Sequence, residues 1–343
     1  MPPAAQATVI TLNAGDDLQT VINGAASGDT IKLTGNFSVT TGLGINAKNI
    51  TFDLNGFNLN ISNNASDGLS VYGGSVVDYT GTGSFTASSY VSVGIRVWDN
   101  GSSCTLTGVQ TTANMVAIFS INQTTVIVNG NVTATGAGSW GIVAQNGSTV
   151  TVNGNVTATN TGVQAAGANT TVTVNGTITA PTYIVLNGFA KTAADFVTPP
   201  PTPGYNTYRD ATPTTVWVLL APVIATPAGA LADATAGTAY SATLAASGSP
   251  TSWALTGAPA WLSISNAGVL SGTPPAAAAG TTVSFSVTAS NGGGASAPVA
   301  FNIAIRAPGT GTATAVPTLG EWSLVLLALA MLGVAGAGLK RRG

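Results

Sequence analysis

A repeat spaced at 21 to 27 residues is the feature that most limits how this chain can fold. The blocks TVIVNGNVTAT, TVTVNGNVTAT and TVTVNGTITA align on Gly130, Gly154 and Gly176. Weaker copies, LTGNFSV, DLNGFNL, GTGSFTA and LTGVQTT, extend this glycine column to Gly35, Gly56, Gly83 and Gly108. A unit of this length cannot bury its apolar face alone, so its copies must stack on one another.

A second column, offset from the first, has the same period. It consists of GLSVY, GIRVW, AIFSI, GIVAQ and GVQAA, which begin at Gly68, Gly94, Ala117, Gly141 and Gly162. Alternate residues in each copy are apolar, as in a strand with one buried face. Two such strands per repeat predict a parallel β-helix over residues 8–196, with amides at one corner forming a ladder. These amides belong to Asn55, Asn129, Asn153 and Asn175.

The alternative is a set of hairpins, because Asn-Gly between alternating residues is typical of tight β-turns. The Asn-Gly pairs recur at the repeat period, however, which favours the coil. The opening TLNAGDDLQTVINGAASGDTIKL, followed by NITFDLNG, resembles the first coils of pectate-lyase-like right-handed β-helices. This resemblance covers about residues 8–190 and implies that a short helix from Asp17 to Ala25 caps the open end of the core. The fold class expected is all-β.

Composition argues against catalysis. Charged residues make up 6% of the chain and histidine is absent, so the usual acid, base and metal-binding side chains are scarce. Among the acidic residues of the coil, Asp53, Asp67, Asp78 and Asp99 show no paired pattern. We therefore expect no catalytic residue, metal or cofactor, and the alternative is a secreted polysaccharide lyase or hydrolase. The weakly acidic balance makes nucleic acid an improbable partner, and the single cysteine, Cys104, is expected to be buried.

A candidate ligand site comes from the second column. Tyr72 and Trp98 occupy the same offset, so they should lie on neighbouring turns and point outward, beside Arg96 and Asp99. Exposed aromatic rings next to polar groups suit the flat apolar faces of sugars. The alternative is that both rings pack under a loop, because their turns are the longest.

Beyond the repeats, a proline-rich linker is expected at 197–215 because prolines cannot continue a strand ladder. Short alternating runs at 216–306 predict a β-sandwich. WALTGAPAWLSI, GVLSGTPP and FSVTASN there resemble the Ig-like domains of bacterial surface proteins. Cadherin-like relatives bind calcium through several acidic residues, whereas this copy has only Asp233, so no metal is expected. Three aromatic residues are expected in its core: Trp253, Trp261 and Phe285.

The C-terminal region reads as a flexible spacer at 307–315 followed by an apolar, membrane-spanning helix. Residues 323–339 carry no charge and would form a helix of about 26 Å. Lys340, Arg341 and Arg342 follow, and the positive-inside rule places such a cluster in the cytoplasm. Everything before Trp322 is then expected outside the inner membrane.

The residues before this helix carry a specific resemblance. Val316, Pro317, Thr318, Leu319 and Trp322 resemble the IPTL-CTERM sorting signal of Gram-negative bacteria, with Val in place of the usual Ile. The resemblance implies that residues 316–343 are recognised by an exosortase-type sorting enzyme at the inner membrane. An uncleaved membrane anchor is the alternative. Residues 1–7 read as a remnant of a leader, given the Ala-Gln-Ala triplet, or as a plain tail.

Together these features predict an exported, surface-sorted structural or adhesion protein. Its β-helix would face matrix polysaccharides or other cells, outside the cell or in the extracellular matrix. Besides the secreted enzyme, a further alternative is self-assembly, in which an uncapped end of the coil near Tyr183 to Leu186 pairs with another chain.

Overall fold

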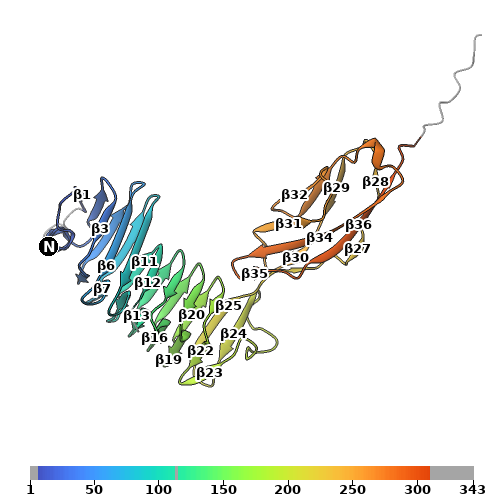
Figure 1. The fold of residues 1–343 in the computed structure, drawn as a ribbon. Helices are drawn as coiled ribbons and strands as arrows, with labels where there is room; N and C mark the ends of the chain where they lie inside the picture. The colour runs from blue at the N-terminus through green and yellow to red at the C-terminus, as the bar shows by residue number, and fades with distance from the viewer. Residues whose placement is uncertain (1–6, 113–114, 310–343) are drawn as a thin grey trace, which may run out of the picture.

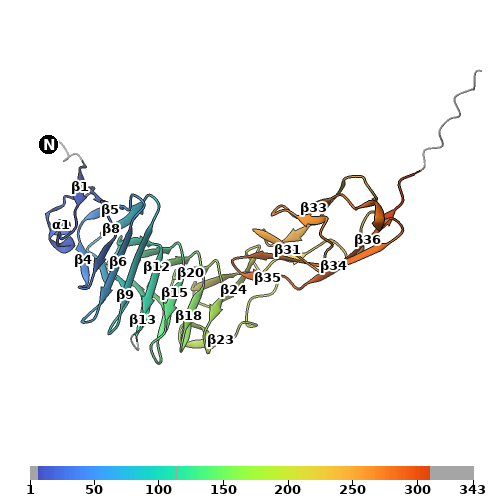
Figure 2. The same cartoon turned by 45° about the horizontal axis from the view of Figure 1, so that its top comes forward.

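The chain forms a parallel β-solenoid followed by a β-sandwich (Figures 1 and 2). This computed structural model describes residues 7–112 and 115–309. In Figure 1 the strands coloured blue to yellow-green stack along one axis, and the orange strands form the second body. The stacked part comprises about seven turns in the described residues.

Three sheets run along the solenoid within the described residues. Sheet A comprises, in order, β1 (Val9–Leu12), β2 (Thr30–Leu33), β5 (Asn49–Asp53), β8 (Val76–Thr80), β11 (Ser103–Leu106), β14 (Thr125–Val128), β17 (Thr149–Val152), β20 (Thr171–Val174), β25 (Thr215–Leu219) and β24 (Tyr205–Arg209). Sheet B comprises β3 (Phe37–Val39), β6 (Asn58–Asn63), β9 (Ser84–Ser89), β12 (Gly108–Thr111), β15 (Val132–Ala134), β18 (Val156–Ala158) and β21 (Ile178–Thr179). Sheet C comprises β4 (Leu43–Asn46), β7 (Leu69–Tyr72), β10 (Ile95–Val97), β13 (Val116–Ile121), β16 (Trp140–Gln145), β19 (Thr161–Ala166), β22 (Thr182–Leu186) and β23 (Phe189–Lys191).

The pairing register confirms the stacked coil and rules out the hairpin alternative. One row of sheet C joins residues of successive turns in parallel register, and all of them are fully buried: Leu69, Ile95, Ile118, Ile142 and Val163. Each turn has three strands, however, rather than the two expected. The repeated motif turns a corner at its Asn-Gly-Asn segment, so one block supplies both β14 and β15.

The glycine column is stacked, for a steric reason. A Cβ on Gly154 would lie 2.4 Å from the carbonyl oxygen of Gly130, and one on Gly176 would lie 2.2 Å from that of Gly154. No side chain fits so close to the backbone of the turn below. A Cβ on Gly130 would lie 2.0 Å from the carbonyl oxygen of Thr107. The residue stacked below Gly130 is therefore Thr107, and Gly108 lies outside the column and begins β12.

The predicted amide ladder is present on sheet A, with a tyrosine at each end. Asn175 donates to Asn153 at 2.7 Å, and Asn153 donates to Asn129 at 2.8 Å. At one end Asn129 donates to the hydroxyl of Tyr79, and at the other the hydroxyl of Tyr205 donates to Asn175. The fourth predicted member, Asn55, does not join; its amide donates to the Leu33 carbonyl of the turn below. The ladder ends at the hydroxyl of Tyr79, on β8, and so does not extend to the turn that carries Asn55.

A short helix, α1 (Leu18–Gly24), covers the N-terminal end of the core, as expected from the sequence. The Asp17 side chain accepts a hydrogen bond from the Thr20 amide and begins the helix, while Leu18 and Ile22 are buried beneath it. The Lys48 ammonium donates to three carbonyls at the helix end, those of Ile22, Asn23 and Ala25, at 2.6 to 2.9 Å.

The C-terminal end of the solenoid differs from the expectation in two ways. The edge near Tyr183 to Leu186 is not open, because β22 pairs antiparallel with β23. The solenoid also extends past residue 196, since β25 pairs with β20 and β24 pairs with β25. The proline-rich segment is therefore an excursion that returns to sheet A, and residues 205–219 belong to the solenoid rather than to the expected linker and sandwich.

The second body is a β-sandwich, as predicted, with short strands throughout. Its strands are β26 (Val223–Ile224), β27 (Gly229–Ala230), β28 (Ala234–Thr235), β29 (Tyr240–Thr243), β30 (Ala246–Ser247), β31 (Ser252–Thr256), β32 (Leu262–Ile264), β33 (Val269–Gly272), β34 (Thr282–Asn291), β35 (Gly294–Ala295) and β36 (Val299–Arg306), with one 3₁₀ turn at Ala276–Ala278 in the described part. Phe285 is buried in its core, and Trp253 and Trp261 pack against that core partly exposed. Asp233 forms an ion pair with Arg306. The amide of Asn291 donates to the Leu220 carbonyl, which ties the sandwich to the end of the solenoid.

The C-terminal sorting motif and the expected membrane-spanning helix lie outside the described residues. Within residues 7–112 and 115–309, no helix has both the length and the hydropathy to cross a membrane. Cys104 is buried as expected, and burial raises the pKa of its thiol well above the ordinary value.

Candidate functional site

Tyr72 and Trp98 come together on the outer surface of sheet C. Tyr72 ends β7, and Trp98 follows β10 on the next turn, where its amide donates to the Val71 carbonyl. Their ring centroids are 4.5 Å apart and the rings are parallel to within 1°. This separation is close to the ~4.8 Å spacing of neighbouring strands, so the backbone register itself stacks the rings.

One face of Tyr72 is left uncovered by the turn below. Trp98 covers one side of the phenol ring. On the turn below, the register partner of Tyr72 is Asn46, but the Cε1 and hydroxyl of the ring lie close to Gly44, which has no side chain to fill the space. A Cβ at Gly44 would lie 3.9 Å from the Cε1 and hydroxyl of Tyr72, which is ordinary contact distance. A groove of about 370 Å³ opens here, lined by Gly42, Leu43, Gly44, Ser66, Asp67, Ser70, Tyr72 and Trp98. Its volume falls within the range of small-ligand sites, about 300–1,000 Å³.

The polar wall of the groove is an ion pair between Asp67 and Arg96. The guanidinium donates to both carboxylate oxygens, from Nε at 2.5 Å and from Nη2 at 3.2 Å, and its carbon lies 5.2 Å from the centre of the Phe119 ring. The carboxylate also accepts from the Ser92 hydroxyl at 2.6 Å. Burial by itself would raise the pKa of Asp67, but the hydrogen bonds from Arg96 and Ser92 outweigh it, so the pKa lies below its ordinary value.

The four predicted site residues have different positions relative to the groove. Tyr72 and Trp98 line the groove, partly exposed, rather than lying beneath a loop. Arg96 adjoins it through Asp67, and Asp99 is an exposed turn residue whose carboxylate accepts from the Gly73 amide at 3.2 Å.

Two contributors to the groove were missed in the sequence. Asp67 stands just before the second column, at the head of its strand, and in the sequence its carboxyl group suggests only a potential catalytic acid. Gly44 lies in GLGIN, a further copy of the second column that begins at Gly42, 26 residues before GLSVY. The role of Asp67 depends on Arg96, and the role of Gly44 depends on Tyr72, and in both cases the partner lies on a neighbouring turn.

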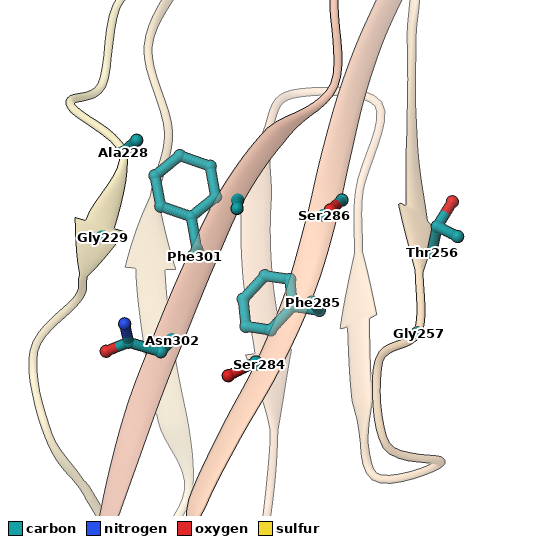
Figure 3. Close-up of a pocket in the computed structure, with 10 residues that line it drawn as sticks. Ala228, Gly229, Thr256, Gly257, Ser284, Phe285, Ser286, Phe301 and Asn302 are labelled. Atoms are coloured by element: carbon teal, nitrogen blue, oxygen red, sulfur yellow. The ribbon is translucent and has the colours of Figure 1, made fainter.

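Other hollows of the described residues offer less chemistry. On the sandwich, a hollow of about 580 Å³ lies over β34 and β36 (Figure 3), lined by Ser284, Ser286, Asn302 and neighbours without a charged group among them. In the described part of the chain, no three acidic, histidine or cysteine side chains are grouped so that they could hold a metal ion.

Comparison with known families matches both segments that follow the solenoid. The model described as a putative Ig domain matches residues 221–306, and the IPTL-CTERM motif matches residues 314–342. The chain carries a C-terminal sorting signal. With the Ig-like domain and the solenoid, this signal indicates an exported, cell-surface protein. The family boundary at 221 agrees with the end of β25 at Leu219.

Solved structures and curated proteins add little to this. A putative α-galactosidase from Bacteroides fragilis is 20% identical over 25% of this chain and 18% of its own, with a TM-score of 0.22. An endo-fucoidan hydrolase of glycoside hydrolase family 107 is 25% identical over 34% of this chain and 20% of its own, with a TM-score of 0.23. The chain thus spans about a fifth of either protein, and likeness at such scores carries no information on activity. No curated protein matches the sequence.

Proposed function

We propose that this protein is an adhesion or matrix-binding protein whose solenoid binds extracellular glycans at the groove beside Tyr72 and Trp98. The observation that carries this is the uncovered face of Tyr72, which Trp98 supports from behind and Gly44 leaves accessible. Sugar rings have apolar faces that pack on aromatic rings, and hydroxyl groups that need polar partners at the rim. Ser70 and Asp67 supply such partners in the same groove.

Binding without turnover is part of this proposal. Glycoside hydrolysis by the usual route needs two carboxyl groups across the scissile bond, one of them protonated as a general acid. The groove has one carboxyl group, Asp67, and Arg96 and Ser92 hold its pKa low, so it stays ionised. These features support a binding role over the alternative of a lyase or hydrolase, and an assay for released reducing ends would detect the latter.

Two substitutions test the binding groove from opposite directions. Trp98→Ala removes the support behind Tyr72, and Gly44→Leu fills the groove while leaving both rings in place. We expect each to weaken glycan binding about tenfold or more, because buried aromatic contacts dominate such interfaces. A glycan array followed by calorimetry on the best ligand measures the effect. Phe189→Ala, an exposed ring at the end of the solenoid, is the control, and equal losses in all three variants would refute the proposed site.

The C-terminal sorting signal leads to a separate prediction, cleavage of the precursor. We propose that a membrane-spanning helix at 323–339, with Lys340, Arg341 and Arg342 in the cytoplasm, holds the precursor until an exosortase-type enzyme cleaves near Pro317. Mass spectrometry of the protein recovered from the cell surface should then find a new C-terminus near Pro317. Recovery of the intact end at Gly343 would instead support the uncleaved anchor.

A further inference from the structure

The outer face of sheet C differs in chemistry from the outer face of sheet B. One outward row of sheet B carries hydroxyl and amide side chains from turn to turn: Ser62, Ser88, Gln110, Thr133, Thr157 and Thr179. The corresponding row of sheet C becomes aromatic and aliphatic in its middle: Ser70, Arg96, Phe119, Val143, Gln164 and Val185. Beside the Tyr72 groove this row thus carries Arg96 and the Phe119 ring, and Val143 on the following turn is buried.

A second groove lies further along the axis, at the corner where the strands of sheet C begin; by register Trp140 lies on the side of β16 that carries Ile142 rather than in the row of Phe119 and Val143. The groove has a volume of about 530 Å³ and is lined by Met115, Val116, Gly138, Trp140 and Asn160. Trp140 begins β16 and is partly exposed, beside Met115, which is 42% exposed. The groove combines an aromatic ring with a polar side chain, Asn160, just as the first groove combines its rings with Ser70 and Asp67.

The two grooves are too far apart for one sugar but within reach of a chain. The strand register aligns Trp98 with Ile121 on the next turn and with Gln145 on the turn after that. Trp140 lies five residues before Gln145 in the same strand. At about 4.8 Å per strand and 3.3 Å per residue, the separation is roughly 19 Å along a diagonal. Arg96 and Phe119 lie between the two grooves and contact each other.

The charges on this face select among polysaccharides. Arg96, the cation between the grooves, is paired with Asp67, so the pair offers no unpaired positive charge. Asp99, exposed beside Trp98, carries a negative charge that would repel an anionic polymer. An uncharged chain meets no such penalty.

We propose that one uncharged polysaccharide chain binds diagonally across both grooves, with Tyr72 and Trp98 on the outer face of sheet C at one end and Trp140 at the corner of the sheet at the other. This inference rests on the proposed function and extends it to a substrate class and a second subsite. Joining two weak subsites through one ligand raises affinity by the effective concentration of the second contact. Affinity should therefore increase with chain length until both grooves are occupied.

The test measures binding of the full chain to cello-oligosaccharides and manno-oligosaccharides of increasing length, with oligogalacturonates as the anionic counterpart. We expect the longest uncharged ligands to bind at least roughly tenfold tighter than the disaccharides. Trp140→Ala should remove that gain while leaving disaccharide binding unchanged, and Met115→Ala at the exposed rim should reduce the gain in part. Trp98→Ala should weaken both, and Phe189→Ala neither.

Each contrary result identifies what is wrong. If Trp140→Ala leaves the gain with length intact while Trp98→Ala abolishes binding, the second subsite is refuted and the first groove stands. If affinity grows only along the oligogalacturonate series, the uncharged class is refuted. If neither uncharged series binds, this inference fails, and a charged or branched ligand on the array would still support the first groove. Matching thermal melts of the variants exclude misfolding as the cause.

Discussion

Replacing Phe85 with alanine is expected to lower the free energy of unfolding by about 3–5 kcal/mol. The side chain is fully buried, with its ring centroid 5.1 Å from that of Phe52 and 6.4 Å from that of Tyr79. Its removal leaves a cavity that the neighbouring turns cannot close, because their spacing is set by the backbone ladders on all three sheets. Denaturant unfolding followed by circular dichroism measures the loss.

The matched control is Phe189→Ala. Phe189 is 71% exposed on β23, so the same change in composition should alter the free energy of unfolding by less than about 0.5 kcal/mol. Similar losses in the two variants would mean that Phe85 does not lie in a packed core. Hydrogen exchange shows where the Phe85→Ala variant is destabilised. Because each turn stacks only on its nearest neighbours, the loss of protection should be largest in β6, β9 and β12.

The second large effect is expected from Gly154→Val, at about 3 kcal/mol. The added Cβ would meet the Gly130 carbonyl oxygen at 2.4 Å and its carbon at 2.6 Å, and both are backbone atoms that cannot rotate away. Relief requires the two turns to separate, which breaks the hydrogen bonds on either side of the corner. Thermal melting and the denaturation midpoint should both decrease.

Gly35→Val provides the comparison for this variant. No heavy atom lies within 4 Å of a Cβ at Gly35, and neither glycine has a positive φ, so the two substitutions differ in space and not in backbone strain. We expect the Gly35 variant to remain close to the parent protein in stability. A Gly154 variant that melts like the Gly35 variant would show that the turns stack less closely at this corner than described.

Much of the solenoid could be predicted from periodicity. The buried row through Leu69, Ile95 and Ile118 follows from the second column, because residues that share an offset in a stacked repeat must share a row. The same reasoning places Tyr72 beside Trp98 and Asn153 beside Asn175. It is less reliable where the repeat length varies: Gly108 fits the spacing of the glycine column, but it begins β12 and lies outside the stacked column.

The candidate site could be predicted only in its aromatic half. An aromatic ring at a repeated offset is visible in one dimension, but the groove depends on what the next turn lacks. Gly44 matters because it leaves a ring face uncovered on a strand 28 residues later in the chain, and no pattern within either segment records that. Likewise the pairing of Asp67 with Arg96 joins residues on neighbouring turns, with no shared motif.

The sequence by itself determined the stacking period, the buried rows, the amide ladder on its repeated asparagines, the sandwich and the sorting motif. Each of these depends on residues that repeat or on a local pattern, so alignment of the chain with itself or with a known motif is enough. Tertiary structure alone decided the third strand of each turn, the return of β24 and β25 to sheet A, the covering of β22 by β23, and the open face of Tyr72. These features arise from contacts between turns and at the end of the stack, where the repeat stops and neighbouring side chains, or their absence, determine the surface.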